Sequence, residues 1–369
     1  DTVKALGMLA SEHRNRSAAT SVVAVTGSNG KTTVKRMIGH ILAKRLAGTC
    51  SPKSFNNEIG VPVTLLGVRT GDDYVVCEVG SSAPGEIDAL GRMIRPNIGV
   101  ITSVGPTHLV KMKSLAQVAV EKASLLNSVQ PDGLAVVWGD SEELNRAVRA
   151  YRGQVIRFGC NKACQLRLTD YRAIRRTCRF ELNGRLWVDL PLAGLHNAMN
   201  AVAAIAVAER LGFERDRAAG ALADFVGAAM RLEWVDAGQV TIINDAYNAN
   251  PSSVVAAAEV LGDQPGRRRV MVVGDMRELG QAAEQLHLQA GRDIVSRNLD
   301  LLIGVGALGR YIAVGAGRSA LATECFDTVD ELADQIGDVL APGDVVLVKG
   351  SRAMGMERLV LAIEVVFQK

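Results

Sequence analysis

The sequence has few aromatic residues and no long apolar run, and each absence excludes a class of protein. Aromatic side chains make up 4% of the 369 residues, whereas apolar side chains make up 48%. This balance favours α/β packing rich in alanine, valine and leucine over an aromatic β-sandwich. No apolar run reaches the roughly 18 residues that a membrane-spanning helix needs, and no signal peptide pattern opens the chain. We therefore expect a cytoplasmic protein without a membrane span.

The chain also lacks an excess of one charge and lacks paired cysteines. The net charge is +3, and no basic stripe of the kind that nucleic acid binding requires is present. Cys160, Cys164 and Cys178 do not have the Cys-x-x-Cys spacing of a zinc site. We therefore expect reduced thiols and no nucleic acid partner. The oligomeric state is not predicted.

Apolar runs alternate with helical patterns along most of the chain, which predicts two α/β units. We expect a helix and linker over residues 1–16, a central domain over 17–229 and a C-terminal domain over 230–369. Such alternation is typical of a parallel sheet with helices on both faces. The expected strands of the central domain are Val22–Val25, Tyr74–Val79, Ile98–Val104 and Leu134–Trp138.

The pattern changes after residue 150. Short alternating runs between Val155 and Leu190, with the turn signal Asn183-Gly184, predict antiparallel strands added to the sheet edge. Helices are expected at 197–211 and 214–226. The second series of strands is expected at Val240–Asn244, Val270–Val273, Leu301–Val305 and Val345–Val348, and the second domain resembles a Rossmann fold.

The first strand leads into a glycine-rich turn and then a helical pattern. This turn comprises Gly27, Ser28, Asn29, Gly30, Lys31, Thr32 and Thr33. Glycines let backbone N–H groups approach a phosphate, and the helix N-terminus adds positive potential. Lys31 would then reach the outer phosphates of a nucleotide, and the Thr32 hydroxyl would bind Mg²⁺. An ordinary strand-to-helix turn is the alternative.

Two further candidates, Glu78 and His108, lie at or after the ends of the next strands. The carboxyl ends of parallel strands meet at one edge, so Lys31, Glu78 and His108 should converge on one crevice. Mg²⁺ often takes one carboxylate together with substrate phosphates, which suits Glu78. Structural roles for Glu78 and His108 are the alternative.

Three polar stretches later in the chain are also candidates. Asn197 and Asn200 are three residues apart on one helix face and would read a purine edge, unless Asn197 is simply an N-cap. Asp245 ends a strand and would bind ribose hydroxyls, and Ser252 or Ser253 would cap the next helix. Lys349, Ser351 and Arg352 would meet a carboxylate or phosphate, or form a surface turn.

Together these motifs resemble the Mur ligase family of ATP-dependent amide-bond ligases. The resemblance runs from Ala5 to Val360. The sequence motifs that carry the resemblance most strongly are Thr26-Gly-Ser-Asn-Gly-Lys-Thr-Thr33, Phe55-Asn-Asn-Glu-Ile-Gly-Val-Pro62, Glu78-Val-Gly80, His196-Asn197, Asp245-Ala-Tyr-Asn-Ala-Asn-Pro251, Gly274-Asp-Met-Arg-Glu-Leu-Gly280 and Lys349-Gly-Ser-Arg352. The motifs at Asp245–Pro251 and Gly274–Gly280 resemble those of the family branch that adds D-alanyl-D-alanine to UDP-N-acetylmuramoyl-tripeptide in peptidoglycan synthesis.

The resemblance implies a role for each matching position. The loop from Gly27 to Thr33 would hold ATP, together with Asn197, Asn200, Arg231 and Asp245. Two Mg²⁺ ions are implied, with Thr32, Glu78, His108 and Lys122 as ligands, Lys122 acting as a carbamate. Lys31, Glu78, His108, Lys122 and Arg231 would be catalytic. The residues implied for the substrates are Asn56, Asn57, Tyr247, Asn248, Asn250, Lys349 and Ser351.

The reaction implied is activation of a carboxylate by ATP, attack of the D-alanyl-D-alanine amine on the acyl phosphate, and loss of phosphate. The sequence departs from the family in two respects. The phosphate loop begins at Thr26, so the usual N-terminal UDP-binding domain is expected to be missing. Lys122 is followed by Ala123-Ser124 where the family has Gly-Glu. A Mur-type ligase with a smaller acceptor and a non-catalytic ATP-binding subunit are the alternatives.

Overall fold

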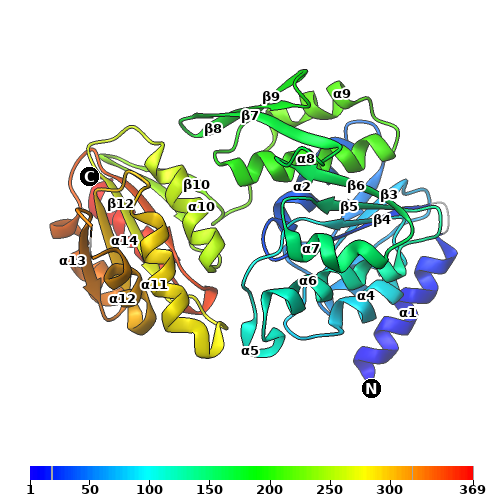
Figure 1. The fold of residues 1–369 in the computed structure, drawn as a ribbon, viewed down its shortest axis with the longest axis horizontal. Helices are drawn as coiled ribbons and strands as arrows, with labels where there is room; N and C mark the ends of the chain where they lie inside the picture. Colours follow the sequence, from blue (N-terminus) through cyan, green and yellow to red (C-terminus); the bar gives the residue numbers. More distant parts are fainter. Residues whose placement is uncertain (18–19, 318, 369) are drawn as a thin grey trace.

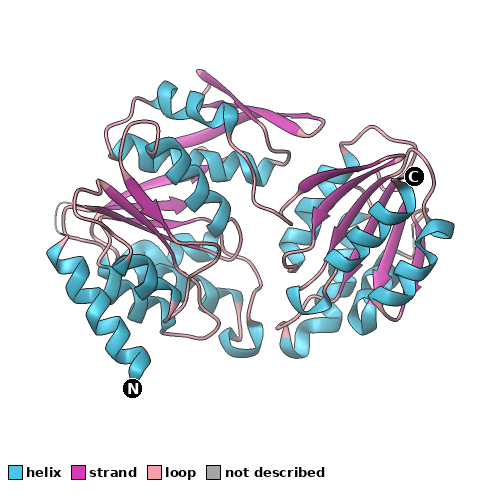
Figure 2. Cartoon of the chain, turned by 180° about the vertical axis from the view of Figure 1, so that it is seen from behind, coloured by secondary structure: helices cyan, strands magenta, loops and turns pink. Residues whose placement is uncertain are grey.

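The computed structural model describes residues 1–17, 20–317 and 319–368, and it contains two α/β units, each built on its own sheet (Figure 1). We call the part built on the nine-stranded sheet the central domain, and the part built on the six-stranded sheet the C-terminal domain. The N-terminus lies on the central domain, and the C-terminus lies on the other domain (Figures 1 and 2). Residues 18–19, at the start of the predicted central domain, lie outside the described residues.

The central sheet has the strand order β2-β3-β1-β4-β5-β6-β7-β8-β9. Strands β2 to β7 pair in parallel, and β7, β8 and β9 pair antiparallel. The strands are β1 (Ser21–Thr26), β2 (Gly48–Cys50), β3 (Tyr74–Glu78), β4 (Ile98–Ile101), β5 (Leu134–Trp138), β6 (Gln154–Gly159), β7 (Leu166–Ile174), β8 (Thr177–Leu182) and β9 (Leu186–Leu190).

Helices cover both faces of the parallel part of this sheet, which explains why its strands are apolar on both sides. Helices α2 (Lys31–Leu42) and α8 (Leu195–Arg210) share one hydrophobic core with the sheet, and α9 (Arg215–Gly220) completes it. The other face is covered by α1 (Thr2–Arg16), α3 (Gly60–Leu66), α4 (Glu86–Ile94), α6 (Leu115–Ala123) and α7 (Glu142–Ala147). The short helix α5 (Leu109–Met112) extends toward the C-terminal domain (Figure 1).

The C-terminal sheet has the order β10-β11-β15-β12-β13-β14, with only β10 antiparallel. Its strands are β10 (Glu233–Ala237), β11 (Val240–Asp245), β12 (Arg269–Gly274), β13 (Leu301–Val305), β14 (Ala322–Phe326) and β15 (Val345–Lys349). Helices α10 (Pro251–Gly262), α11 (Ala283–Ile294) and α12 (Gly306–Ala316) cover one face, and α13 (Val329–Val339) and α14 (Glu357–Phe367) cover the other. The α/β class and the two-sheet architecture agree with the sequence-based prediction.

Five elements were predicted wrongly or not at all. Strand β6 is parallel to both neighbours, not antiparallel. The alternation of apolar residues is the same in both kinds of strand, so it could not indicate the direction. The segment from Gly60, where the two prolines Pro52 and Pro62 had suggested a loop and an apolar turn, is the helix α3, since Pro62 lies in its first turn, where a missing N–H costs nothing. Strands β2 and β14 were not predicted, being short or exposed edge strands. Strand β10 was also missed.

No helix in the parts of the chain that the structure describes combines the length and hydropathy of a membrane span.

Candidate active site

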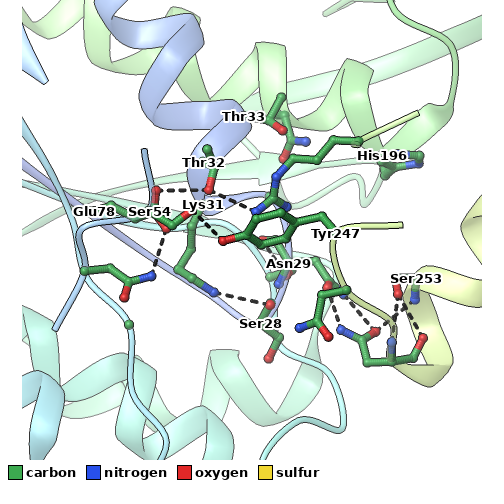
Figure 3. Close-up of a pocket in the computed structure, with 18 of the residues that line it drawn as sticks. Ser28, Asn29, Lys31, Thr32, Thr33, Ser54, Glu78, His196, Tyr247 and Ser253 are labelled. Atoms are coloured by element: carbon green, nitrogen blue, oxygen red, sulfur yellow. Dashed lines mark hydrogen bonds between the residues drawn. The ribbon is translucent and has the colours of Figure 1, made fainter. Parts of the chain in front are cut away.

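A cavity of about 950 Å³ lies between the two domains, at the carboxyl ends of β1, β3, β11 and β15. All of the predicted site residues line this cavity except Gly27, Lys122, Ser351 and Arg352. Figure 3 shows side chains from both domains pointing into it, with Thr32 and Glu78 near Tyr247. The expected convergence of Lys31, Glu78 and His108 on one crevice is therefore confirmed.

The phosphate loop needs its two glycines for steric reasons. Gly27 has φ +149°, and a Cβ there would collide with the Thr102 hydroxyl. Gly30 has φ +83° and is the N-cap of α2, where a Cβ would meet the Asn200 amide. The backbone thus reaches positions that other residues enter at a cost, and it presents the α2 N-terminus to the cavity.

Lys31 lies folded against the loop that carries it. Its Nζ donates to the carbonyl oxygens of Gly27 at 2.7 Å and Ser28 at 3.4 Å. Burial lowers the pKa of Lys31, and the nearby Arg231 lowers it further, whereas Glu78 opposes the shift. A nucleotide phosphate bound to this loop would place a negative charge beside the buried ammonium and stabilise its charged form.

Glu78 holds the centre of a buried polar cluster. Its carboxylate accepts from the Thr32 hydroxyl at 3.0 Å and the Asn56 amide at 3.0 Å, and Lys35 Nζ forms an ion pair with it at 3.1 Å. The hydroxyl and the carboxylate, placed beside a phosphate loop, form the oxygen donor set that Mg²⁺ takes together with phosphates. These residues therefore fit the implied cation. No cluster of three or more His, Cys, Asp or Glu side chains in the described ranges suits a metal without such phosphates.

Lys122 is buried beneath the cavity wall and donates to the Ser81 hydroxyl at 2.8 Å. Burial lowers the pKa of Lys122 to about 7, and Lys31 contributes to this shift, whereas Glu121 and Glu86 oppose it. A neutral amine is the form that reacts with carbon dioxide, so the environment fits the implied carbamate. The neighbouring Glu121 is not free for catalysis, because it accepts from the backbone of Gly85 at 2.7 Å and of Ile87 at 2.9 Å.

His108 meets a residue of the C-terminal domain that the sequence did not single out. Its Nδ1 forms an ion pair with the Glu278 carboxylate, and the Val110 N–H points at the Glu278 carbonyl at 3.4 Å. Burial lowers the pKa of His108, although Glu278 opposes that shift. The ring's second nitrogen is left for another partner, as a metal ligand requires.

Arg231 and Tyr247 cross from the C-terminal domain to the phosphate loop. Arg231 donates to the Thr32 hydroxyl at 3.3 Å and lies over the Tyr247 ring at 4.0 Å from its centre. Tyr247 donates in turn to the Ser54 hydroxyl at 2.9 Å (Figure 3). This stacked pair places a guanidinium where the outer phosphates of a bound nucleotide would lie.

The residues predicted to bind the nucleoside also lie together. Asn200 donates to Asn197 at 3.3 Å, so the two amides share one face of α8. Asn197 lies within the helix and Gly194 is the N-cap, so the capping alternative for Asn197 is wrong. Asp245 forms an ion pair with Lys349 at 2.6 Å at the cavity edge, and Lys349 also donates to the Asn248 carbonyl at 2.9 Å.

Two predictions for the C-terminal domain need correction. Neither Ser252 nor Ser253 is the cap of α10, because Asn250 is the N-cap and Ser253 completes a capping box with it. Ser351 is buried outside the cavity lining, and its hydroxyl accepts from the Arg277 N–H at 2.8 Å. Ser351 therefore supports the loop around Arg277 in this structure and does not face the cavity.

Sequence reasoning missed four residues at the site, namely Lys35, Ser81, His196 and Glu278. Lys35 lies one helical turn beyond Lys31, so a helical wheel would have placed it on the same face. Ser81 adjoins the motif Glu78–Gly80, His196 belongs to the motif His196-Asn197, and both line the cavity. Glu278 belongs to a quoted motif, but only the packing of the two domains shows its contact with His108.

Comparison with known proteins agrees with this geometry. The Mur ligase middle domain model matches residues 25–208, and the model described as Mur ligase, glutamate ligase domain matches residues 230–352. The UDP-N-acetylmuramoyl-tripeptide–D-alanyl-D-alanine ligase of Bacillus subtilis is 35% identical over 370 residues, covering 98% of this chain and 79% of the relative.

Two solved structures extend the likeness to the fold. MurF from Acinetobacter baumannii superposes with a TM-score of 0.92 at 32% identity, covering 99% of this chain and 81% of that one. MurF from Thermotoga maritima in complex with ADP gives a TM-score of 0.89 at 26% identity, covering 100% and 84%. The chain therefore belongs to the Mur ligase family of ATP-dependent amide-bond ligases.

Proposed function

We propose that this chain joins D-alanyl-D-alanine to the terminal carboxylate of UDP-N-acetylmuramoyl-tripeptide, with hydrolysis of ATP to ADP and phosphate. The observation that carries the proposal is the single cavity that joins the phosphate loop to the Tyr247–Asn250 segment of the C-terminal domain. The relatives at about one third identity that bear this activity in their names support the choice of substrates.

ATP would lie with its phosphates on the loop from Gly27 to Thr33 and its base toward Asn197 and Asn200. Lys31 would leave the loop carbonyls and bind the outer phosphates. Arg231 would approach the same phosphates from the other domain, stacked on Tyr247. Asp245, at the end of β11, would accept hydrogen bonds from the ribose. All of these positions except Gly27 line the one cavity.

The first chemical step is attack of the substrate carboxylate on the γ-phosphorus of ATP, which releases ADP and forms an acyl phosphate. The amine of D-alanyl-D-alanine then attacks the acyl carbon. Collapse of the tetrahedral intermediate expels phosphate and leaves the amide. Lys31 and Arg231 would stabilise the charge on the transferring phosphoryl group, because positioned cations in a dry site act without reorganisation.

Thr32 and Glu78 would hold one Mg²⁺, and His108 with carbamylated Lys122 would hold a second. Such ions supply Lewis acid stabilisation of the phosphoryl oxygens. The protein's own contribution is to keep these ligands in place: Lys35 and Asn56 fix the Glu78 carboxylate, and Ser81 fixes the Lys122 amine. Asn56, Asn57, Asn248 and Lys349 would orient the carboxylate and amine substrates in the remaining part of the cavity.

The decisive assay is phosphate release from ATP and Mg²⁺ with UDP-N-acetylmuramoyl-tripeptide, in the presence and absence of D-alanyl-D-alanine. We expect release and amide product only with both substrates. Lys31→Ala should lower turnover by about 10²–10³-fold. Release that requires a different carboxylate acceptor would establish the smaller-acceptor alternative, and no release with any pair would leave a non-catalytic ATP-binding role.

A further inference from the structure

The loop from Gly274 to Gly280 of the C-terminal domain carries Glu278, whose side chain contacts the central domain. Three buried side chains, those of Asp275, His287 and Ser351, hold this loop in place through hydrogen bonds. Asp275 accepts from the N–H groups of Leu308 at 2.8 Å and Gly309 at 2.9 Å, at the start of α12. His287 accepts from the Met276 N–H at 2.8 Å, and Ser351 accepts from the Arg277 N–H at 2.8 Å. A loop anchored at three consecutive residues positions the next one, Glu278, precisely.

The central domain meets this loop with its own fixed segment, residues 108–112. Glu278 contacts His108 through its carboxylate and Val110 through its carbonyl. Leu109, between them, packs against the apolar core of the C-terminal domain and also against a core cluster of the central domain. Gly280 lies against Val110. Side chain, backbone and apolar contacts therefore hold His108 to Glu278.

Both partners adopt the left-handed backbone conformation. His108 has φ +54° and Glu278 has φ +65°. Glycine would occupy such positions without strain, whereas a residue with a side chain is strained there. Residues in this conformation cluster at functional sites, so the presence of these side chains at both positions favours a role for the pair itself.

The geometry assigns Glu278 as a positioning residue for His108, and this assignment rests on the function proposed above. The carboxylate lies against Nδ1 of the ring, so it favours a proton on that nitrogen and thereby the tautomer in which Nε2 is free for a divalent cation. Metal-binding histidines are commonly oriented by such a carboxylate. Here the carboxylate belongs to the other domain, so packing of the C-terminal domain onto residues 108–112 completes the ligand set of the central domain.

The test uses the whole chain with Mn²⁺ and ADP, so that it does not depend on turnover. Electron paramagnetic resonance measures Mn²⁺ affinity in the ADP-bound protein, and ¹⁵N NMR of the histidine rings reports the His108 tautomer, assigned with His108→Gln. Glu278→Ala should weaken Mn²⁺ binding by about 10–100-fold and shift the ring toward the Nε2–H tautomer. Glu278→Gln keeps a hydrogen-bond acceptor, so its effect should be intermediate.

Glu284→Gln is the matched control, since Glu284 is an exposed carboxylate at the start of α11, and it should bind Mn²⁺ as the wild type does. Equal Mn²⁺ affinity of Glu278→Ala and wild type would overturn the assignment. Weaker binding with an unchanged tautomer would also overturn it, because Glu278 would then act through its charge alone. If the wild type forms no amide product, the proposed substrates fail, whereas the Mn²⁺ and NMR results still decide the role of Glu278.

Discussion

Asn29 of the phosphate loop and Asn250 at the start of α10 hydrogen-bond each other through both side-chain amides. Asn250 donates to Asn29 at 2.7 Å, and Asn29 donates back at 3.3 Å. Asn29 also donates to Ser252 at 3.0 Å. The loop that would hold the phosphates is thus bound directly to the N-terminus of a helix in the other domain, so occupancy of the loop and placement of that domain are coupled.

This pair predicts the behaviour of Asn250→Asp. Aspartate keeps the acceptor that caps α10 through Ser253, but it cannot donate to Asn29. We expect the KM for ATP to rise about 2- to 12-fold, since losing a hydrogen bond of this kind costs about 0.5–1.5 kcal/mol, with little change in thermal stability. Steady-state kinetics and a melting curve check this. Ser253→Ala, which weakens only the cap, should show the opposite pattern, and a KM equal to wild type in Asn250→Asp would refute the coupling.

The buried ion pair of Lys35 with Glu78 predicts how much Mg²⁺ with ADP stabilises variants of either residue. Both side chains are at most 2% exposed. Removing one partner of a buried pair typically costs about 3–5 kcal/mol, because the other charge stays buried. In Lys35→Met, Mg²⁺ with ADP can replace the lost cation, so the ligands should raise the melting temperature more than in the wild type. In Glu78→Gln they should not. Calorimetry with and without Mg²⁺ measures both, and equal ligand effects in the two variants would contradict the prediction.

His287 predicts a loss of stability in acid. The ring is fully buried, with Nε2 accepting from the Met276 N–H and Nδ1 facing the Ala283 carbonyl at 2.6 Å. Burial lowers the pKa of His287 below its ordinary value, although Ala283 and Asp275 oppose the shift. Below about pH 6.5 the unfolded chain therefore binds a proton that the folded chain does not, and stability should fall with pH by up to about 1.4 kcal/mol per unit for this group.

Urea unfolding between pH 7.5 and 5 measures the slope. His287→Gln retains an acceptor but does not titrate, so its stability should depend less steeply on pH than that of the wild type. If the free energy of unfolding depends on pH equally in the two proteins, another group causes the loss of stability in acid.

Lys122 predicts a requirement for carbon dioxide. The buried amine next to Ser81 is held in a place where a carbamate oxygen would reach the cavity wall. We expect native mass spectrometry to show a mass gain of one carbon dioxide that Lys122→Arg lacks, and activity to fall when bicarbonate is removed and return when it is added. Full activity in carbon dioxide-free buffer would exclude the carbamate.

The sequence predicted the parts of the site that follow from strand ends and local motifs. Lys31, Glu78 and His108 lie in one cavity because parallel strands of one sheet bring their carboxyl ends together, a rule that depends only on element order. The partners of these residues were harder to predict. Lys35 looked like an ordinary helix residue, and the contact of Glu278 with His108 depends on how two domains pack, which no local pattern encodes. The direction of β6 and the exposed edge strand β14 escaped prediction for the same reason, since pairing is a long-range property.

The packing of the partly buried Leu109 against the hydrophobic cores of both domains has a consequence for hydrogen exchange. Helix α5 has four residues, far fewer than an isolated helix needs to be stable in water. The amides of this helix lose protection when the domains separate, because the Val110 N–H donates to the Glu278 carbonyl and Leu109 packs against both domains. Their exchange rate therefore measures how often the domains separate, which makes α5 an internal reporter of that opening in the native protein without any attached label.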